Sequence, residues 1–151
     1  MLAAYLGLAL VGYRIVAPLS SRATGLFTVA GLLLFSVWAF PAWTFAFYSP
    51  FSVLFALAAL ERLLAWQKSS LRRDLLLTGV WLGLSICFKQ NYGAFALVGC
   101  GAGYLAGLLE ARRSLSTVLR QAPAEIGLVA AGAGLAGLPF LLYLGAHDAL
   151  G

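Results

Sequence analysis

Residues 89–93, Lys89-Gln90-Asn91-Tyr92-Gly93, interrupt a stretch that is otherwise almost continuously apolar from residue 75 to residue 109. This stretch is far longer than the roughly 20 residues that a helix needs to cross a bilayer once. Consecutive Lys, Gln and Asn side chains cannot face lipid, because an unpaired polar group in hydrocarbon is energetically costly. The interruption therefore lies at a membrane surface or lines a polar cavity, and it divides the stretch into two spans.

The composition is that of a polytopic membrane protein. Of the 151 residues, 62% are hydrophobic and 10% are charged, whereas a soluble domain is about 45–50% apolar and about 25% charged. The net charge of +5 would suggest a nucleic-acid ligand in a soluble protein. Here the basic residues lie in short links between apolar runs, which is the usual pattern of cytoplasmic loops. We therefore expect membrane lipid, and no nucleic acid, around this chain.

Apolar runs predict an all-α fold, a polytopic transmembrane helical bundle of about six spans that forms a single transmembrane domain over residues 1–151. The first and fourth runs are short enough to be tilted, truncated or partly re-entrant. The polar segment 110–125, which carries Arg120 and Pro123, is interpreted as a link. The predicted spans are residues 2–17, 26–40, 51–66, 75–88, 92–109 and 126–144.

The distribution of Lys and Arg predicts the orientation. Nine of the ten basic residues lie in three alternate links, and Lys89 alone lies on the other side. The positive-inside rule then places the three basic links in the cytoplasm and the Lys89 cluster, the aromatic link at residues 43–48 and both chain ends outside. The nine residues are Arg14, Arg22, Arg62, Lys68, Arg72, Arg73, Arg112, Arg113 and Arg120.

Glycine patterns in the spans indicate helix packing. Gly99, Gly103 and Gly107 recur every fourth residue, a spacing that lets a helix approach a packing partner closely in lipid. Residues 132–137, GAGLAG, match a dinucleotide-binding fingerprint. They lie within a predicted span and no strand precedes them, so we assign them to helix packing as well.

The sequence shows no catalytic constellation. No His, Cys or carboxylate cluster has the spacing of metal ligands, and no acid–base pair at helical spacing is present among the outer charged residues. We therefore name no catalytic residue and expect no metal and no other cofactor.

Lys89 is the candidate for a binding role. In one interpretation it is an interfacial lysine that stabilises the C-terminal end of the fourth span. In the other, its ammonium is held beside the amides of Gln90 and Asn91 and the hydroxyl of Tyr92. That set suits a phosphate or pyrophosphate at headgroup level, since a lysine ammonium pairs well with phosphate oxygens. The residues alone leave both interpretations open.

Residues 79–93, GVWLGLSICFKQNYG, resemble a segment that recurs in bacterial GT-C-type membrane glycosyltransferases. These enzymes are the relatives of protein O-mannosyltransferases and of the lipid A aminoarabinose transferase. In that family a basic link leads into a glycine-containing span that ends in Lys, often followed by Gln-Asn and Gly. The upstream part is similar too, with an outer aromatic link and a span that returns to a basic loop. The resemblance covers about residues 26–109.

The resemblance implies transfer of a sugar from a polyprenyl-phosphate donor to an acceptor on the outer side of a bacterial inner membrane. It also implies that Lys89, Gln90 and Asn91 contact the donor phosphate. The family's catalytic acid lies in an outer loop after its first span, whereas this sequence starts with a span that runs inward. We therefore expect this chain to be a fragment that lacks the first span and the catalytic loop.

Two other classes of protein remain open. A small six-span transporter or half-transporter could also contain a buried Lys, and a non-catalytic assembly subunit could be held by its glycine faces. A transporter would need a repeat between residues 1–66 and 75–144, and none is visible beyond general hydropathy. It would also tend to place polar groups at mid-membrane. The polar cluster lies instead at the end of a span, which favours the lipid-phosphate interpretation.

Overall fold

The computed structural model describes residues 2–38, 49–110 and 115–146, which are helical apart from short turns. No β-strand occurs in these three ranges, so the predicted all-α class is confirmed. The helices are α1 (Leu2–Leu19), α2 (Arg22–Trp38), α4 (Ser49–Ser69), α5 (Arg72–Phe88), α6 (Gln90–Glu110) and α7 (Leu115–Ala146).

The segment 110–125 differs from its prediction as a link. Residues 115–125 form the first turns of α7, a helix of 32 residues with Pro123 and Pro139 inside it. A proline inside a helix removes one backbone hydrogen bond, which favours a break. The polar residues around Pro123, among them Arg120 and Gln121, are good helix formers, and packing of α7 against α5 supports the helix. Hydropathy marked the apolar part of α7 and missed its polar start.

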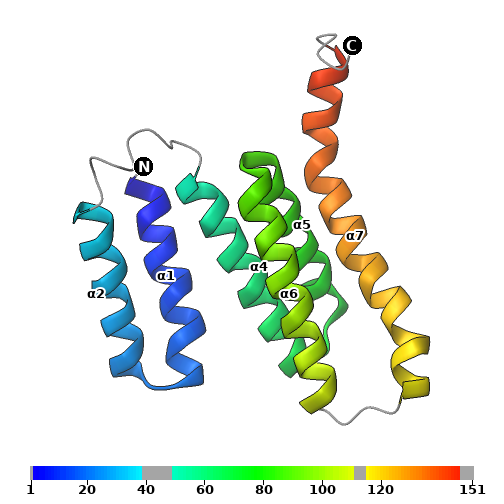
Figure 1. Cartoon of the computed structure of the whole chain (residues 1–151), viewed down its shortest axis with the longest axis horizontal. Helices are drawn as coiled ribbons and strands as arrows, with labels where there is room; N and C mark the ends of the chain where they lie inside the picture. Colours follow the sequence, from blue (N-terminus) through cyan, green and yellow to red (C-terminus); the bar gives the residue numbers. More distant parts are fainter. Residues whose placement is uncertain (1, 39–48, 111–114, 147–151) are drawn as a thin grey trace.

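The helices form a row with one further helix over its centre (Figure 1). Along the row, α2 packs on α1, α1 on α4, α4 on α5, and α5 on α7, while α6 packs on both α4 and α5. Each of α4 and α5 therefore packs on three other helices. The buried apolar cluster comes from α4, α5 and α6, and consists of Ala59, Leu63, Trp66, Leu75, Leu82 and Cys100.

Glycines allow the backbones of α5 and α7 to touch. A Cβ on Gly79 would lie 2.8 Å from the carbonyl carbon of Val129, and one on Gly132 would lie 2.9 Å from the backbone nitrogen of Val80. Gly132 belongs to the GAGLAG segment, so the structure confirms a packing role for this glycine. Gly134 of the same segment faces open space.

Some glycines of α6 face α4 and others face open space. Gly103 and Gly107 face α4, and the Gln67 side-chain amide donates a 2.9 Å hydrogen bond to the carbonyl of Gly103. A Cβ on Gly99 would meet no atom within 4 Å. Two of the three predicted packing glycines thus serve contacts within the chain, and a further packing partner for this face stays a prediction.

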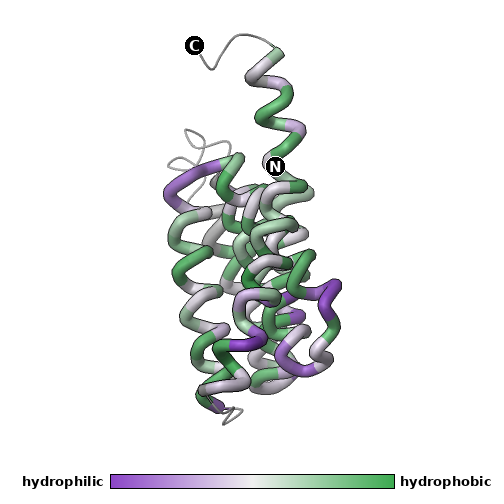
Figure 2. The backbone as a smooth tube through the Cα atoms, turned by 90° about the vertical axis from the view of Figure 1, so that its right-hand side faces the viewer, coloured by the Kyte–Doolittle hydropathy of each residue, from purple (hydrophilic) through white to green (hydrophobic). Residues whose placement is uncertain are grey.

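The outer surface of the helices is strongly apolar. Phe27, Phe95 and Leu109 are 78–80% exposed, and apolar surface on this scale marks a protein or membrane contact. Figure 2 shows hydrophobic segments along the helices and hydrophilic ones mostly toward their ends. Two of the described helices are long and apolar enough to cross a membrane, namely α6 and residues Ser116–Tyr143 of α7. The arrangement of six spans stays a prediction.

We expect Gly79→Ala to lower the free energy of unfolding in detergent by about 1–3 kcal/mol, because the new methyl group would push α5 away from α7. Gly134→Ala is the matched control, since its methyl group would enter open space and alanine raises helix stability by about 0.5–1 kcal/mol relative to glycine. Equal stability of the two variants would contradict the backbone contact.

Candidate functional site at the turn between α5 and α6

Lys89 is the single residue between α5 and α6. Its backbone is extended, with φ −157° and ψ 106°. Its N–H donates to the carbonyl of Ser85, and its carbonyl accepts from the N–H of Gly93, both at 3.0 Å. Lys89 therefore ends one helix and begins the next. The polar cluster divides the apolar stretch into two helices, as the sequence predicts.

The turn is tight because Gly93 lies against the backbone of α5. A Cβ on Gly93 would lie 2.6 Å from the Cα atom and 2.7 Å from the nitrogen of Ile86. Any larger residue would therefore force α5 and α6 apart within one turn of Lys89. Because Gly93 has no side chain, α5 and α6 approach closely, and this approach determines the position of the backbone from which the Lys89 side chain extends.

The structure brings Lys89 and Tyr92 into direct contact. The Lys89 ammonium lies 4.7 Å from the centre of the Tyr92 ring, within the range of a cation–π interaction. Sequence reasoning assigned a role to the Tyr92 hydroxyl, whereas the face of its ring is the part that meets Lys89. Gln90 and Asn91 are exposed on the first turn of α6.

The start of α6 adds to the positive potential at this turn. The first N–H groups of a helix have no partner within the helix, and the helix dipole places partial positive charge at the same end. Together with the Lys89 ammonium and the exposed amides of Gln90 and Asn91, they form a donor-rich, cationic turn. We refer to residues 89–92 as the Lys89 turn. Its chemistry suits an anion.

A pair of buried serines stabilises the last turn of α5, which leads into the Lys89 turn. Ser52 Oγ donates to the carbonyl of Ser85, and Ser85 Oγ donates to the carbonyl of Ser52, each at 2.9 Å. Both residues are completely buried. Since the carbonyl of Ser85 also accepts from Lys89, the pair ties α4 to the last turn of α5. Sequence reasoning missed this pair, because a serine inside an apolar run gives no signal about its partner.

Aromatic side chains pack beside the serine pair. The Phe88 ring lies 5.8 Å from that of Phe51 and 5.2 Å from that of Phe55, between ring centres. Phe55 also stacks on Trp81 at 5.6 Å. These contacts between α4 and α5 reinforce the position of the residue that precedes Lys89.

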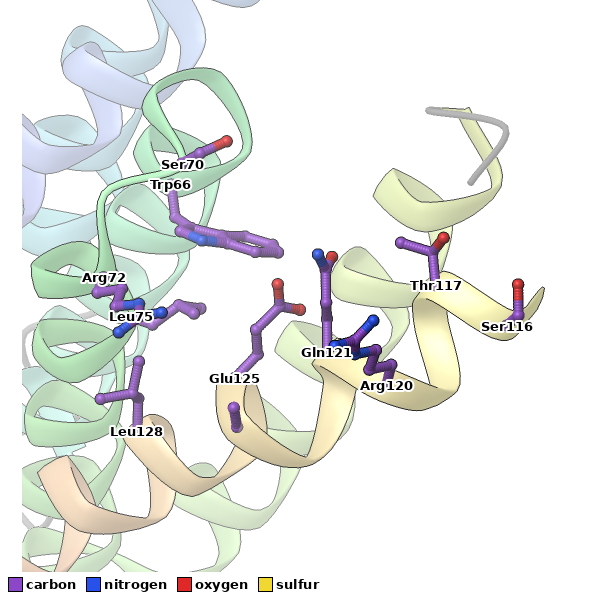
Figure 3. Close-up of a pocket in the computed structure, with 11 residues that line it drawn as sticks. Trp66, Ser70, Arg72, Leu75, Ser116, Thr117, Arg120, Gln121, Glu125 and Leu128 are labelled. Carbon is purple, nitrogen blue, oxygen red and sulfur yellow. The ribbon is translucent and has the colours of Figure 1, made fainter. Parts of the chain in front are cut away.

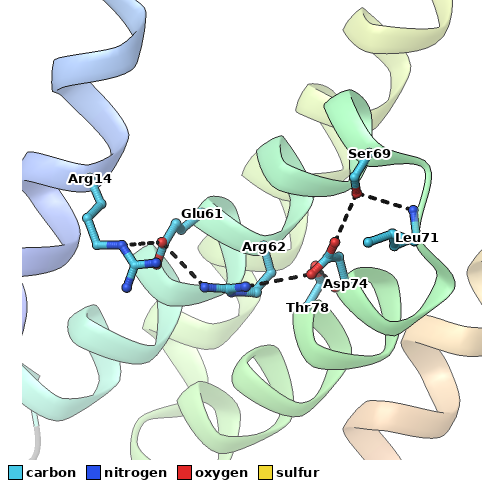
Figure 4. Close-up of polar contacts among 7 residues, drawn as sticks. All are labelled: Arg14, Glu61, Arg62, Ser69, Leu71, Asp74 and Thr78. Carbon is cyan, nitrogen blue, oxygen red and sulfur yellow. Dashed lines mark hydrogen bonds and ion pairs between the residues drawn. The ribbon is translucent and has the colours of Figure 1, made fainter.

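A network of charged side chains lies at the opposite end of α5 (Figure 4). Glu61 pairs with Arg14 at 2.9 Å and with Arg62 at 3.5 Å, and Arg62 reaches Asp74 at 3.6 Å. Asp74 is buried and accepts a 3.0 Å hydrogen bond from Ser69 Oγ. The network connects α1, α4 and α5. These residues therefore have a structural role in addition to any effect on membrane orientation.

We expect Asp74→Ala to lower the free energy of unfolding by about 1–3 kcal/mol, since it removes the charged partner of Arg62 and the acceptor of Ser69. Glu110→Ala is the control, because Glu110 is an exposed carboxylate at the end of α6 and exposed substitutions change stability by about 0.5 kcal/mol or less. Chemical denaturation in detergent measures both. A loss no greater for Asp74→Ala than for Glu110→Ala would show that the network contributes no stability.

Three cavities lined by described residues lie away from the Lys89 turn. One of about 1060 Å³ lies beside the first turns of α7, one of about 400 Å³ lies between α6 and α7, and one of about 380 Å³ lies between α1 and α4. None of these three is lined by residues of the Lys89 turn. Within the described part of the chain, no three His, Cys, Asp or Glu residues converge as they would around a metal ion.

Comparisons of the chain with protein-family models, with curated proteins and with solved structures find no match. The resemblance to membrane glycosyltransferases therefore rests on the sequence features quoted above, above all on residues 79–93.

Proposed function

We propose that this chain is a module of a membrane glycosyltransferase that uses a polyprenyl-phosphate-linked sugar donor on the extracytoplasmic side of a bacterial inner membrane. In this proposal all six helices cross the membrane. The basic residues of the α1–α2 and α4–α5 turns lie at one end of the bundle and the Lys89 turn lies at the other (Figure 1). The positive-inside rule then assigns the Lys89 turn to the outer surface.

The observation that carries the proposal is the position of the Lys89 ammonium, 4.7 Å from the Tyr92 ring and beside the start of α6. A lysine ammonium carries three N–H donors and a full positive charge, which pairs well with phosphate oxygens. The exposed amides of Gln90 and Asn91 add donors on the same turn. In the proposal this set binds the phosphate of the lipid-linked donor at headgroup level.

Phosphate binding at Lys89 would assist the transfer itself. When the bond between the sugar carbon and the phosphate oxygen breaks, the electron pair stays on the polyprenyl phosphate. A fixed cation beside that oxygen stabilises the developing negative charge. The acceptor hydroxyl must lose its proton to a base, and we assign no residue of the Lys89 turn to that step. The role proposed here is donor binding and stabilisation of the leaving group.

We expect Lys89→Gln to weaken binding of undecaprenyl phosphate to the purified chain in an uncharged detergent by about tenfold or more, since it removes a charge-assisted interaction with the phosphate. Lys68→Gln is the matched control, because it removes an exposed lysine at the opposite end of the bundle. Native mass spectrometry gives both affinities. If Lys89→Gln binds undecaprenyl phosphate as tightly as the unsubstituted chain does, the proposed site is excluded.

Variants of Tyr92 separate the ring from the hydroxyl. Tyr92→Phe keeps the ring face under the Lys89 ammonium, so we expect its affinity for undecaprenyl phosphate to stay within twofold. Tyr92→Leu removes the cation–π contact and should weaken binding by about threefold to tenfold, through looser placement of Lys89. If Tyr92→Phe weakens binding as much as Tyr92→Leu, the hydroxyl contacts the ligand and the assignment to the ring is wrong.

We expect a cysteine at Gln90 to react with a membrane-impermeant thiol reagent applied to whole cells, and a cysteine at Lys68 to stay unlabelled until the cells are opened. Gln90→Cys and Lys68→Cys replace exposed residues at opposite ends of the bundle. Both are made in a Cys87→Ala, Cys100→Ala background, which removes the native cysteines. Labelling of Lys68→Cys alone in intact cells would reverse the proposed orientation.

A further inference from the structure

A cavity of about 1060 Å³ lies at the basic end of the bundle, beside the α4–α5 turn and the first turns of α7. Small-molecule sites commonly measure about 300–1,000 Å³, so this cavity has room for much more than a single ion. Figure 3 shows Arg72 on one wall, Arg120 and Gln121 on the opposite wall, and the side chains of Trp66 and Glu125 between them. We refer to it as the polar cavity.

The two arginines of the polar cavity differ from those of the charge network. Ion pairs among the described side chains involve Arg14 and Arg62, and none involves Arg72 or Arg120. Both Arg72 and Arg120 are exposed. A guanidinium matches the geometry of a phosphate group and can bind it through two parallel hydrogen bonds. The two guanidinium groups outnumber the single carboxylate of Glu125, so the charged side chains that line the cavity have a net positive charge. This charge favours an anion in the cavity.

An apolar slot of about 400 Å³ adjoins the polar cavity. Leu75 and Glu125 line both spaces, so the two share a wall. The slot lies between α6 and α7, and both of these helices pack on α5. Its apolar lining includes Leu63, Leu82, Leu97, Leu105, Leu108 and Ile126. A basic, polar space beside an apolar one fits an amphiphile with an anionic headgroup.

We propose that the polar cavity and the apolar slot together bind one anionic glycerophospholipid of the phosphatidylglycerol type. Its phosphate lies between Arg72 and Arg120, and one acyl chain lies in the slot between α6 and α7. This site is at the opposite end of α5 from the Lys89 turn, so it is separate from the proposed donor site and does not depend on it. Basic pockets between membrane helices bind lipid headgroups in this way.

Glu125 selects among anionic headgroups. Its carboxylate accepts a 2.5 Å hydrogen bond from the Tyr104 hydroxyl, and a carboxylate has about four acceptor positions. It would repel a bare phosphate and accept hydrogen bonds from a headgroup that also carries hydroxyls. A glycerol headgroup supplies these hydroxyls next to a singly charged phosphodiester, whereas an isoprenyl phosphate has no alcohol hydroxyl and its monoester phosphate can carry a second negative charge. The combination of two arginines and one carboxylate therefore favours phosphatidylglycerol.

The first test measures binding of dioctanoyl phosphatidylglycerol to the purified chain in an uncharged detergent by native mass spectrometry. We expect one lipid per chain. The double variant Arg72→Gln, Arg120→Gln should bind it at least tenfold more weakly, because it loses the charge-assisted bonds to the phosphate. Arg73→Gln is the matched control: Arg73 is exposed and adjacent in sequence but does not line the cavity, and its affinity should stay within twofold.

The second test concerns the apolar slot. Gly101 lines the slot, and a Cβ there would meet no atom within 4 Å, so Gly101→Leu adds an apolar side chain at the slot from a position with open space around its Cβ. We expect it to weaken lipid binding by about tenfold. Gly99→Leu is the control, since Gly99 also faces open space on α6 but does not line the slot. Its affinity should be unchanged.

Four results would each overturn the proposal. Arg73→Gln could weaken binding as much as the double variant, which would indicate general charge attraction. Dioctanoyl phosphatidylcholine could bind as tightly, which would exclude recognition of an anionic headgroup. Inorganic phosphate could displace the lipid at equal concentration, which would exclude a contribution from the slot. In the Lys89→Gln variant, farnesyl phosphate could displace bound dioctanoyl phosphatidylglycerol at a lower concentration than phosphatidylglycerol itself, which would identify an isoprenyl phosphate as the occupant of this site.

Discussion

Close contact between the backbone of α5 and its neighbours determines the geometry of the rest of the chain. Gly79 and Gly132 remove side chains from the contact with α7, and Gly93 does the same at the contact with α6. Helices in lipid associate through such close packing, because lipid tails are as apolar as the helix surfaces and provide no hydrophobic driving force. Helix α5 begins at Arg72, beside the polar cavity, and ends one residue before Lys89.

Buried polar side chains in the described part of the chain find hydrogen-bond partners within the bundle. Ser52 and Ser85 bond to each other's carbonyl groups, and Thr78 donates to the carbonyl of Asp74 at 2.8 Å. No buried side-chain nitrogen or oxygen lacks a hydrogen-bond partner in the described ranges. The charged groups that could bind a ligand lie at the two ends of α5. This division places the binding chemistry at the two ends of the bundle.

Sequence patterns predicted most of the helices and the position of the Lys89 turn. Hydropathy separated α5 from α6 at Lys89, because a run of polar residues cannot continue a lipid-facing helix. It missed the start of α7, where good helix formers surround Pro123. The packing glycines were recognised as a class, but only the structure shows that Gly103 faces α4 while Gly99 faces open space. Spacing identifies a helix face and does not identify its neighbour.

The sequence by itself determined the helical class, the apolar surface and the placement of Lys89 between two helices, since each follows from local composition and from the cost of polar groups in lipid. Only the tertiary structure decided that Ser52 meets Ser85, that the Lys89 ammonium lies over the Tyr92 ring, and that Arg72 and Arg120 face one cavity. The serine pair and the shared cavity depend on how helices distant in sequence pack against each other, whereas the Lys89–Tyr92 contact depends on the conformation of the turn between α5 and α6. Backbone approach at a few glycines sets that packing, and helical periodicity does not encode it.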